Sequence, residues 1–239
     1  MNNQSQNLMT LDLEALASNL DYTKHRAGPE KRMIASIKAN AYGHDVSLIA
    51  GALHEKRVDM LATGNIDDAR ILRACGVDTP LLLFAYATAE NTVNAAKEGF
   101  ISTVPNLTSA ISLDAMTSVP IPVYLKIDCG LGRLGAPLSI AKDFVTKVYQ
   151  LKNLKVEGIY THVPFSDVAS SPWAQGKLDQ FDKLVEELES NGYSIPVTQA
   201  MGSCCVLAGL RDKSNAVCVG HALYGLSPFS SEQALTFHD

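Results

Sequence analysis

The chain has 239 residues, of which 46% are hydrophobic, and this is enough to bury one large core. Its net charge is -5 and no stretch is rich in lysine or arginine, which argues against nucleic acid as a partner. The apolar runs are too short to span a bilayer, and residues 1–10 lack the apolar centre of a signal peptide, so we expect a cytoplasmic protein without membrane contact. The five cysteines have no metal-ligand spacing, so we expect free thiols and no metal.

An amphipathic helix is predicted first, over residues 11–26, because leucines recur on one face and Gly28-Pro29 ends it. Strand-like and helix-like segments then alternate. Apolar runs predict strands at 33–37, 59–63, 80–84, 102–104, 122–127, 155–160, 197–201 and 216–218. Helical spacing between them predicts helices at 46–54, 66–74, 89–98, 106–116, 139–151 and 172–190. Eight alternations predict an α/β protein with one parallel (β/α)8 barrel, a TIM-like barrel, over residues 1–230.

Polar residues follow several of these predicted strands, where the active-site groups of such a barrel collect. In chain order they are Lys38, Tyr42, Arg133, His162, Ser203, Gly220, His221 and Tyr224. The loops after the seventh and eighth strands often bind phosphate. Ser203 would supply a hydroxyl there, and Gly220 a backbone that a ligand can approach closely because it lacks Cβ.

Lys38 ends the first apolar strand, and a glycine follows where the chain would turn into a helix. A lysine at the mouth of a buried strand is expected to be desolvated, which favours its neutral amine. Schiff-base chemistry with a carbonyl or with pyridoxal phosphate needs such an amine. The alternative is a lysine whose ammonium group extends from the strand end to solvent.

Four stretches together carry a family resemblance: residues 37–44 (IKANAYGH), 126–135 (KIDCGLGRLG), 158–162 (GIYTH) and 220–225 (GHALYG). In this order and spacing, over residues 11–228, the chain resembles the alanine racemases, which are fold-type III pyridoxal-phosphate enzymes. The resemblance implies the interconversion of L- and D-alanine through an external aldimine with pyridoxal 5'-phosphate. It also implies an amino acid as the small-molecule partner, with alanine as the default, and, as is usual in the family, a homodimer.

The resemblance implies a role for each matching residue. Lys38 corresponds to the lysine that carries the cofactor and moves the proton on one face of the substrate. Arg133 corresponds to the arginine that contacts the phenolic oxygen of the cofactor and the substrate carboxylate, and His162 to the histidine beside the pyridine ring. Lys126 matches a lysine that is carbamylated in some members, where the carbamate orients the arginine. The residues expected near the phosphate are Tyr42, Ser203, Gly220, His221 through its backbone amide, and Tyr224.

Two features depart from the family pattern. Cys218 stands where an arginine normally hydrogen-bonds the pyridine nitrogen, which predicts altered reaction specificity or weakened activity; the alternative is a small thiol that simply packs there. The sequence reaches Asp239 near the point where the family's C-terminal β domain, with its opposite-face tyrosine, would begin. We therefore expect residues 231–239 to start a linker to a missing domain, and this chain to racemise poorly for lack of a second base.

Other interpretations remain open at this level. Arg133 could form a surface ion pair, His162 could be a satisfied rim histidine, Ser203 could cap the helix that follows it, and Trp173 is expected to pack. The protein could be a racemase, a non-catalytic or impaired single-domain pyridoxal-phosphate-binding protein, or an aldolase or decarboxylase on the same fold.

Overall fold

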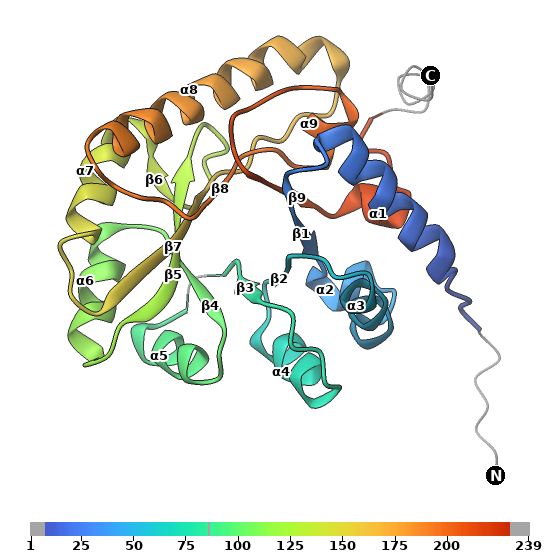
Figure 1. The fold of residues 1–239 in the computed structure, drawn as a ribbon, viewed down its shortest axis with the longest axis horizontal. Coiled ribbons are helices and arrows are strands. Elements are labelled where there is room, and N and C mark those ends of the chain that lie inside the picture. Colours follow the sequence, from blue (N-terminus) through green and yellow to red (C-terminus); the bar gives the residue numbers. More distant parts are fainter. Residues whose placement is uncertain (1–7, 86, 230–239) are drawn as a thin grey trace.

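The computed structural model describes residues 8–85 and 87–229, and in them eight parallel strands close into one barrel (Figure 1). Around the ring the order is β4, β3, β2, β1, β9, β8, β7, β5, and β4 pairs with β5 to close it. The strands are β1 (Arg32–Ser36), β2 (Met60–Thr63), β3 (Leu81–Leu83), β4 (Ile101–Val104), β5 (Ile121–Asp128), β7 (Leu154–Tyr160), β8 (Val197–Gln199) and β9 (Ala216–Val219). A short strand, β6 (Ala136–Pro137), pairs with the end of β5 outside the ring.

Helices surround the strands, as Figure 1 shows. The longer ones are α1 (Leu13–Ala27), α3 (Val46–Glu55), α4 (Ile66–Ala74), α5 (Ala89–Lys97), α6 (Leu107–Met116), α7 (Leu138–Val148) and α8 (Ser171–Ser190). Several begin where sequence chemistry places a cap: the side chains of Asn65, Thr88 and Asn106 each accept a backbone N–H of the first turn. The short elements α2 (Lys38–Tyr42), η1 (Val168–Ser170), α9 (Ser203–Leu207) and η2 (His221–Tyr224) lie in loops that follow strands.

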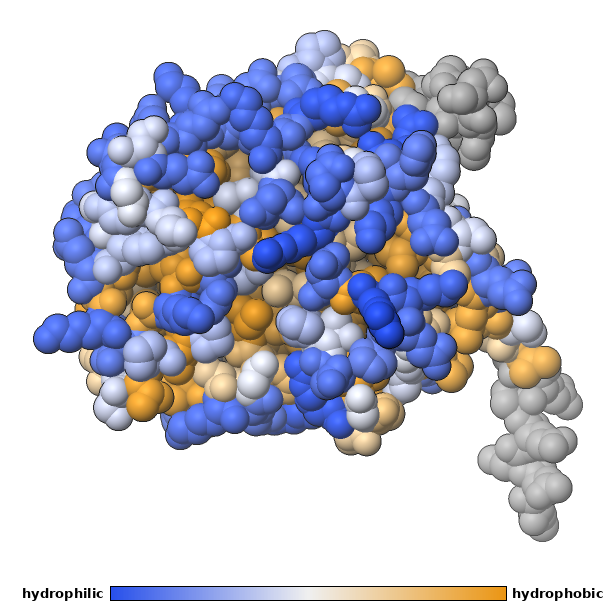
Figure 2. All heavy atoms as spheres, viewed as in Figure 1, coloured by the Kyte–Doolittle hydropathy of each residue, from blue (hydrophilic) through white to orange (hydrophobic). Residues whose placement is uncertain are grey.

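Two apolar clusters hold the barrel together. The inner one fills the barrel and includes Ile34, Met60, Leu82, Tyr124 and Tyr160. The outer one lies between the strands and the surrounding helices. Figure 2 shows apolar residues between hydrophilic ones across the middle of the face viewed, with a largely hydrophilic rim along α8.

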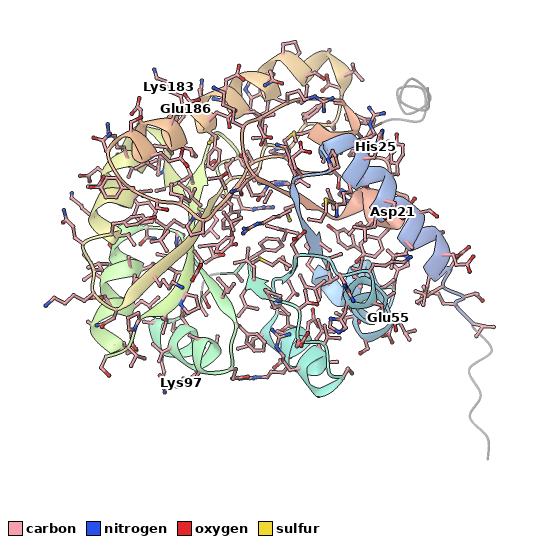
Figure 3. All side chains as sticks on the ribbon, viewed as in Figure 1. Asp21, His25, Glu55, Lys97, Lys183 and Glu186 are labelled. Carbon is pink, nitrogen blue, oxygen red and sulfur yellow. The ribbon has the colours of Figure 1, made fainter. Side chains whose placement is uncertain are left out.

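Charged residues of the outer helices point away from the strands into solvent (Figure 3). Those labelled are exposed: Asp21, His25, Glu55, Lys97, Lys183 and Glu186. Apolar faces inward and charges outward are what a helix needs to pack on a sheet.

The predicted fold class is confirmed, and each predicted strand overlaps an observed one. The short elements α2, β6 and α9 were not predicted. Residues 231–239, the expected linker, lie outside the described residues. No described helix combines the length and the apolar character needed to cross a membrane.

Candidate active site

Most of the predicted site residues line one cavity of about 840 Å³. Because these residues follow the ends of different strands, the cavity lies at the end of the barrel where the strands' C-termini meet. The predicted residues that line it are Lys38, Tyr42, Lys126, Arg133, His162, Ser203, Cys218, Gly220 and His221. Tyr224 does not line it but lies directly behind it, with its ring centroid 4.7 Å from that of Tyr42.

Lys38 begins α2, whose backbone is unusual. Residues 39–42 all have φ between 54° and 56°, so they form one left-handed helical turn. For L-residues this conformation costs about 1–2 kcal/mol each, and it persists only where the surroundings enforce it. Here Gly43 closes the turn by donating its N–H to the carbonyls of residues 39 and 40, and the Asn40 side chain accepts from Val46 N at 2.9 Å.

The expectation that Lys38 is desolvated is wrong. Lys38 is exposed where the cavity opens, and its Nζ lies 5.5 Å from the centroid of the Tyr42 ring. The physical reason is that β1 ends at Ser36, so Lys38 leaves the sheet with the left-handed turn instead of ending a buried strand.

Lys126 is the buried lysine of the cavity, with only 4% of its surface exposed. The pKa of its amine is lowered to about 7, mainly by burial; the nearby Arg133 guanidinium contributes to this lowering, while Cys129 and Asp128 oppose it. Its Nζ lies 4.6 Å from the centroid of the Tyr160 ring and donates to Ile127 O at 3.3 Å. A neutral amine is therefore available at Lys126 near neutral pH.

His162 lies partly buried on the same wall. Burial lowers the pKa of its imidazole to about 4, and the positive charges of Lys126, Arg133 and Lys38 add to the effect. The ring is therefore uncharged at neutral pH. Gly202 leaves it room, because a Cβ there would lie 3.3 Å from the His162 Cε1.

Ser203 organises the loop after β9. Its Oγ accepts the backbone N–H of Gly220 at 3.1 Å and of Ala222 at 3.2 Å. The alternative that Ser203 caps the following helix is wrong, because α9 begins at Ser203 itself and its N-cap residue is Gly202. With its acceptor sites used, the Ser203 hydroxyl can donate its proton to a ligand.

Gly220 packs directly against Tyr42. A Cβ at position 220 would lie 2.2 Å from the Tyr42 Oη, so only glycine fits while the phenol keeps its place. Burial raises the pKa of Tyr42, so this hydroxyl stays protonated and can donate a hydrogen bond. Behind it, Tyr224 donates to Ser36 O at 3.2 Å and stacks on His44 with ring centroids 5.0 Å apart.

Arg133 is exposed on the loop between β5 and β6. No carboxylate of the described residues pairs with it, so the ion-pair alternative finds no partner there. Its position at the edge of the cavity leaves the guanidinium available to an anionic ligand.

Cys218 lies on β9 and packs against the inner apolar cluster. Burial raises the pKa of its thiol to about 12, so the group is neutral. Trp173, at the first turn of α8, does not line the cavity; the residue is 45% exposed, and its ring lies close to Gly130.

The cavity lining also includes residues that the sequence analysis did not single out, among them Ser36, Phe84 and Gln199. Ser36 and Gln199 are the last residues of β1 and β8. A polar residue in the final position of an otherwise apolar strand was the available signal for these two.

Comparisons with known proteins give the family and the fold of this chain. The family model for the N-terminal domain of alanine racemase matches residues 11–228. Among curated proteins, the alanine racemase of Methanococcus maripaludis is 30% identical over 222 residues, covering 91% of this chain and 60% of that protein. The alanine racemase of Thioalkalivibrio sulfidiphilus is 33% identical over 231 residues, covering 94% of this chain and 61% of that protein. The chain thus spans about 60% of the length of these relatives.

Solved structures give the same result. An alanine racemase of Clostridium difficile in complex with cycloserine superposes with a TM-score of 0.84 at 26% identity, covering 92% of this chain and 62% of that one. An alanine racemase of Bacillus anthracis with bound L-Ala-P superposes with a TM-score of 0.82 at 27% identity, covering 93% of this chain and 58% of that one.

Proposed function

The chain belongs to the family defined by the alanine racemase N-terminal domain, and on this premise we propose that it acts as a pyridoxal-phosphate-dependent amino-acid racemase that interconverts L- and D-alanine. The observation that supports the proposal is that side chains from different strand ends meet in one cavity. An exposed lysine, an arginine that pairs with no carboxylate of residues 8–85 and 87–229, an uncharged histidine and a set of hydroxyl donors share one cavity. The family assigns each of these groups a role in racemisation.

The donor set of the cavity fits pyridoxal 5'-phosphate. The exposed Lys38 amine can reach an aldehyde in the cavity mouth, and the Ser203 hydroxyl and Tyr42 phenol can donate to a phosphate. Gly220 lets the backbone approach that phosphate, and His162 would lie beside the pyridine ring. When bound, the cofactor withdraws electrons from the substrate and makes its Cα proton acidic.

The protein's own residues would then handle the proton and the carboxylate. Lys38 takes the Cα proton on one face and returns it. Arg133 holds the substrate carboxylate, which fixes the orientation of Cα relative to the lysine. Racemisation also requires a base on the opposite face, because one lysine returns the proton to the side from which it came.

We also propose that Lys126 reacts with carbon dioxide. Its neutral amine would add to the carbon of CO2 to form a carbamate, with loss of one proton, and the new carboxylate would attract the nearby Arg133 guanidinium. Carbon-13 NMR with labelled CO2 tests this: the native chain should show one carbamate resonance that is absent from Lys126→Met. A resonance that persists in the variant would assign the carbamate to another amine.

Cys218 supports a second candidate, a cofactor-binding protein with impaired turnover. In place of the family's arginine it presents an uncharged thiol to the cavity. Such a group tolerates either protonation state of the pyridine nitrogen, so it controls electron withdrawal less tightly. We therefore expect weak or altered catalysis even where the cofactor binds well. Restoring the cation with Cys218→Arg should raise racemisation if this residue is the cause.

The deciding experiment combines the purified chain with pyridoxal 5'-phosphate and L-alanine in deuterated water, and follows both Cα deuterium and chirality. Deuterium in L-alanine alone supports one-sided proton transfer by Lys38. Deuterium in both enantiomers supports full racemisation and places a second base in the chain. Absence of exchange, with the cofactor demonstrably bound, supports the cofactor-binding alternative.

Two variants test the assignments. Lys38→Ala should abolish covalent attachment of the cofactor, measured by borohydride reduction and mass spectrometry; attachment that survives would contradict the role of Lys38. Arg133→Ala should weaken alanine binding more than cofactor binding, and equal losses would mean that the arginine is structural.

A further inference from the structure

Asp128, the last residue of β5, organises the loop that follows it. Its Oδ1 accepts the backbone N–H of Gly130 at 2.9 Å and of Leu131 at 2.8 Å, and its Oδ2 accepts that of Gly132 at 2.8 Å. One carboxylate thus holds three consecutive amides. Because a charged acceptor makes stronger hydrogen bonds than a neutral one, this clamp fixes the backbone immediately before Arg133.

The two ends of this loop are packed tightly. At Gly130, with φ of 128°, a Cβ would lie 3.3 Å from the Lys177 Cε of α8. At Gly135, with φ of 118°, a Cβ would lie 2.8 Å from Lys126 O. Only residues 131–134 lie between these two anchors, and Asp128 binds the first two of them.

Arg133 lies between two hollows. On one side is the main cavity, and on the other is a smaller cavity of about 430 Å³ whose lining includes Asp128 and Asp143. Among residues 8–85 and 87–229 no partner holds the guanidinium on either side. Its direction therefore depends on the backbone from which it projects, and a mobile backbone would let the side chain leave the main cavity.

We infer that Asp128 is a positioning residue, whose clamp on the amides of residues 130–132 aims Arg133 into the main cavity to receive the carboxylate of the amino acid. This inference rests on the proposed function, because it assigns Arg133 the carboxylate. It adds a group that touches neither cofactor nor substrate yet sets the affinity for the substrate.

The first arm of the test uses the whole chain without cofactor. Asp128→Asn keeps the side-chain shape, but its amide group replaces one acceptor oxygen with a donor. NMR hydrogen exchange should show the amides of Gly130, Leu131 and Gly132 exchanging about tenfold faster than in the native chain. The control is Asp12→Asn, which removes a charge at the N-cap of α1 and should leave these amides unchanged.

The same samples report on Arg133 directly. Relaxation of its backbone N–H should show an ordered loop in the native protein and a more mobile one in Asp128→Asn. Unchanged amide exchange, or an arginine equally mobile in both proteins, overturns the inference whether or not the cofactor binds.

The second arm uses the cofactor-loaded chain and follows its visible absorbance during titration with L-alanine. Asp128→Asn should weaken alanine binding about tenfold while the affinity for pyridoxal 5'-phosphate stays within about twofold. In the Arg133→Ala background the same substitution should have no further effect, because the group that it positions is gone. Additive losses, or equal losses for alanine and cofactor, contradict positioning. A native chain that binds neither ligand refutes the proposed function, and the first arm then decides the role of Asp128.

Discussion

Lys126 is buried and His162 is partly buried near it, and each has a lower pKa in the folded chain than an exposed residue would. For His162 the pKa falls from 6.5 to about 4, mainly through burial. The unfolded chain therefore takes up a proton at a pH where the folded chain does not. It follows that this histidine favours unfolding as the pH falls through that window, and has no such effect above about pH 7.

The first prediction concerns the pH range between the folded and unfolded pKa values of His162, from about 4 to 6.5. Between pH 7.5 and 4.5, the unfolding free energy of the native chain should fall relative to that of His162→Gln by up to about 3 kcal/mol, nearly all of it below pH 6.5. Urea unfolding at each pH measures the difference. The contributions of the other titrating groups are the same in both proteins and cancel in the difference. If the unfolding free energies of the two proteins change in parallel with pH, His162 is not desolvated.

Lys126 gives a second prediction, because a buried ammonium lowers the unfolding free energy of the chain. Lys126→Met keeps the packing and removes the charge, so it should raise the unfolding free energy at pH 7 by about 2 kcal/mol in buffer free of CO2. The advantage should shrink as the pH rises toward 10.5, where the unfolded chain also loses the proton. The exposed Lys152→Met should change stability by less than about 0.5 kcal/mol. A destabilised Lys126→Met would mean that the ammonium is well solvated.

The contact between Gly220 and Tyr42 gives a third prediction. Gly220→Ala should cost about 2 kcal/mol of unfolding free energy and weaken the binding of pyridoxal 5'-phosphate, because the new methyl group displaces the phenol. Tyr42→Phe should restore part of the stability in the double variant, since it removes the atom that lies 2.2 Å away. Thermal unfolding measures both effects, and additive losses would place the clash elsewhere.

At this scale the sequence predicted which residues meet, but not how each one is solvated. The order of polar residues after the strands was enough to bring Lys38, His162 and Ser203 to one cavity. Solvation depends on where each lysine lies relative to its strand: Lys126 lies within β5 and is buried, whereas Lys38 lies beyond the end of β1 and is exposed. That is why the desolvated amine belongs to Lys126 and not to Lys38.

Among the elements, α2 is the one whose conformation could not be predicted from the sequence. It contains Ala39 and Ala41, and alanine is the best former of ordinary right-handed helix, yet residues 39–42 turn the other way. Four consecutive left-handed residues follow Lys38 directly, and the hydrogen bonds of Gly43 and Asn40 hold them in place. Propensity is a local quantity, whereas these hydrogen bonds depend on where α3 begins.

The fourth prediction follows from this strain. Ala39 is exposed and left-handed, so Ala39→Gly should stabilise the chain by about 0.5 kcal/mol, the relief of strain exceeding the added freedom of the unfolded chain. In the right-handed helix α6, the exposed Ala115→Gly should instead cost up to about 1 kcal/mol. Urea unfolding distinguishes the two signs. A loss of stability in both variants would contradict a left-handed turn in solution.

The long helices and the strands were predictable because each has a repeated apolar pattern. The exceptions are short: α9 has 5 residues and β6 has 2. Segments of this length contain too few residues to show a period. Their positions are set by the ends of β8 and β5 and by side chains such as Asp128, which act across loops.

For the whole molecule, the proposed ligand gives a fifth prediction. Pyridoxal 5'-phosphate at one hundred times its dissociation constant should raise the unfolding free energy by about 2.7 kcal/mol. In Lys38→Ala the gain should be smaller at the same concentration, because covalent attachment is lost. Thermal unfolding at several cofactor concentrations measures this gain. An unfolding midpoint temperature that does not change with cofactor concentration would contradict binding to the folded chain.

Closure of the barrel has a consequence for how the protein is made. β1 pairs with β9, so Arg32 lies in register with Ala216, and its backbone N–H donates to Asn215 O at 2.9 Å, although these residues are far apart in the sequence. Until β9 leaves the ribosome, β1 and β8 both present unpaired backbone edges that other chains can join. Contacts so distant in sequence form slowly, and the growing polypeptide stays open to aggregation until they form. The finished ring buries those edges, so the period of greatest risk for this chain is its own synthesis.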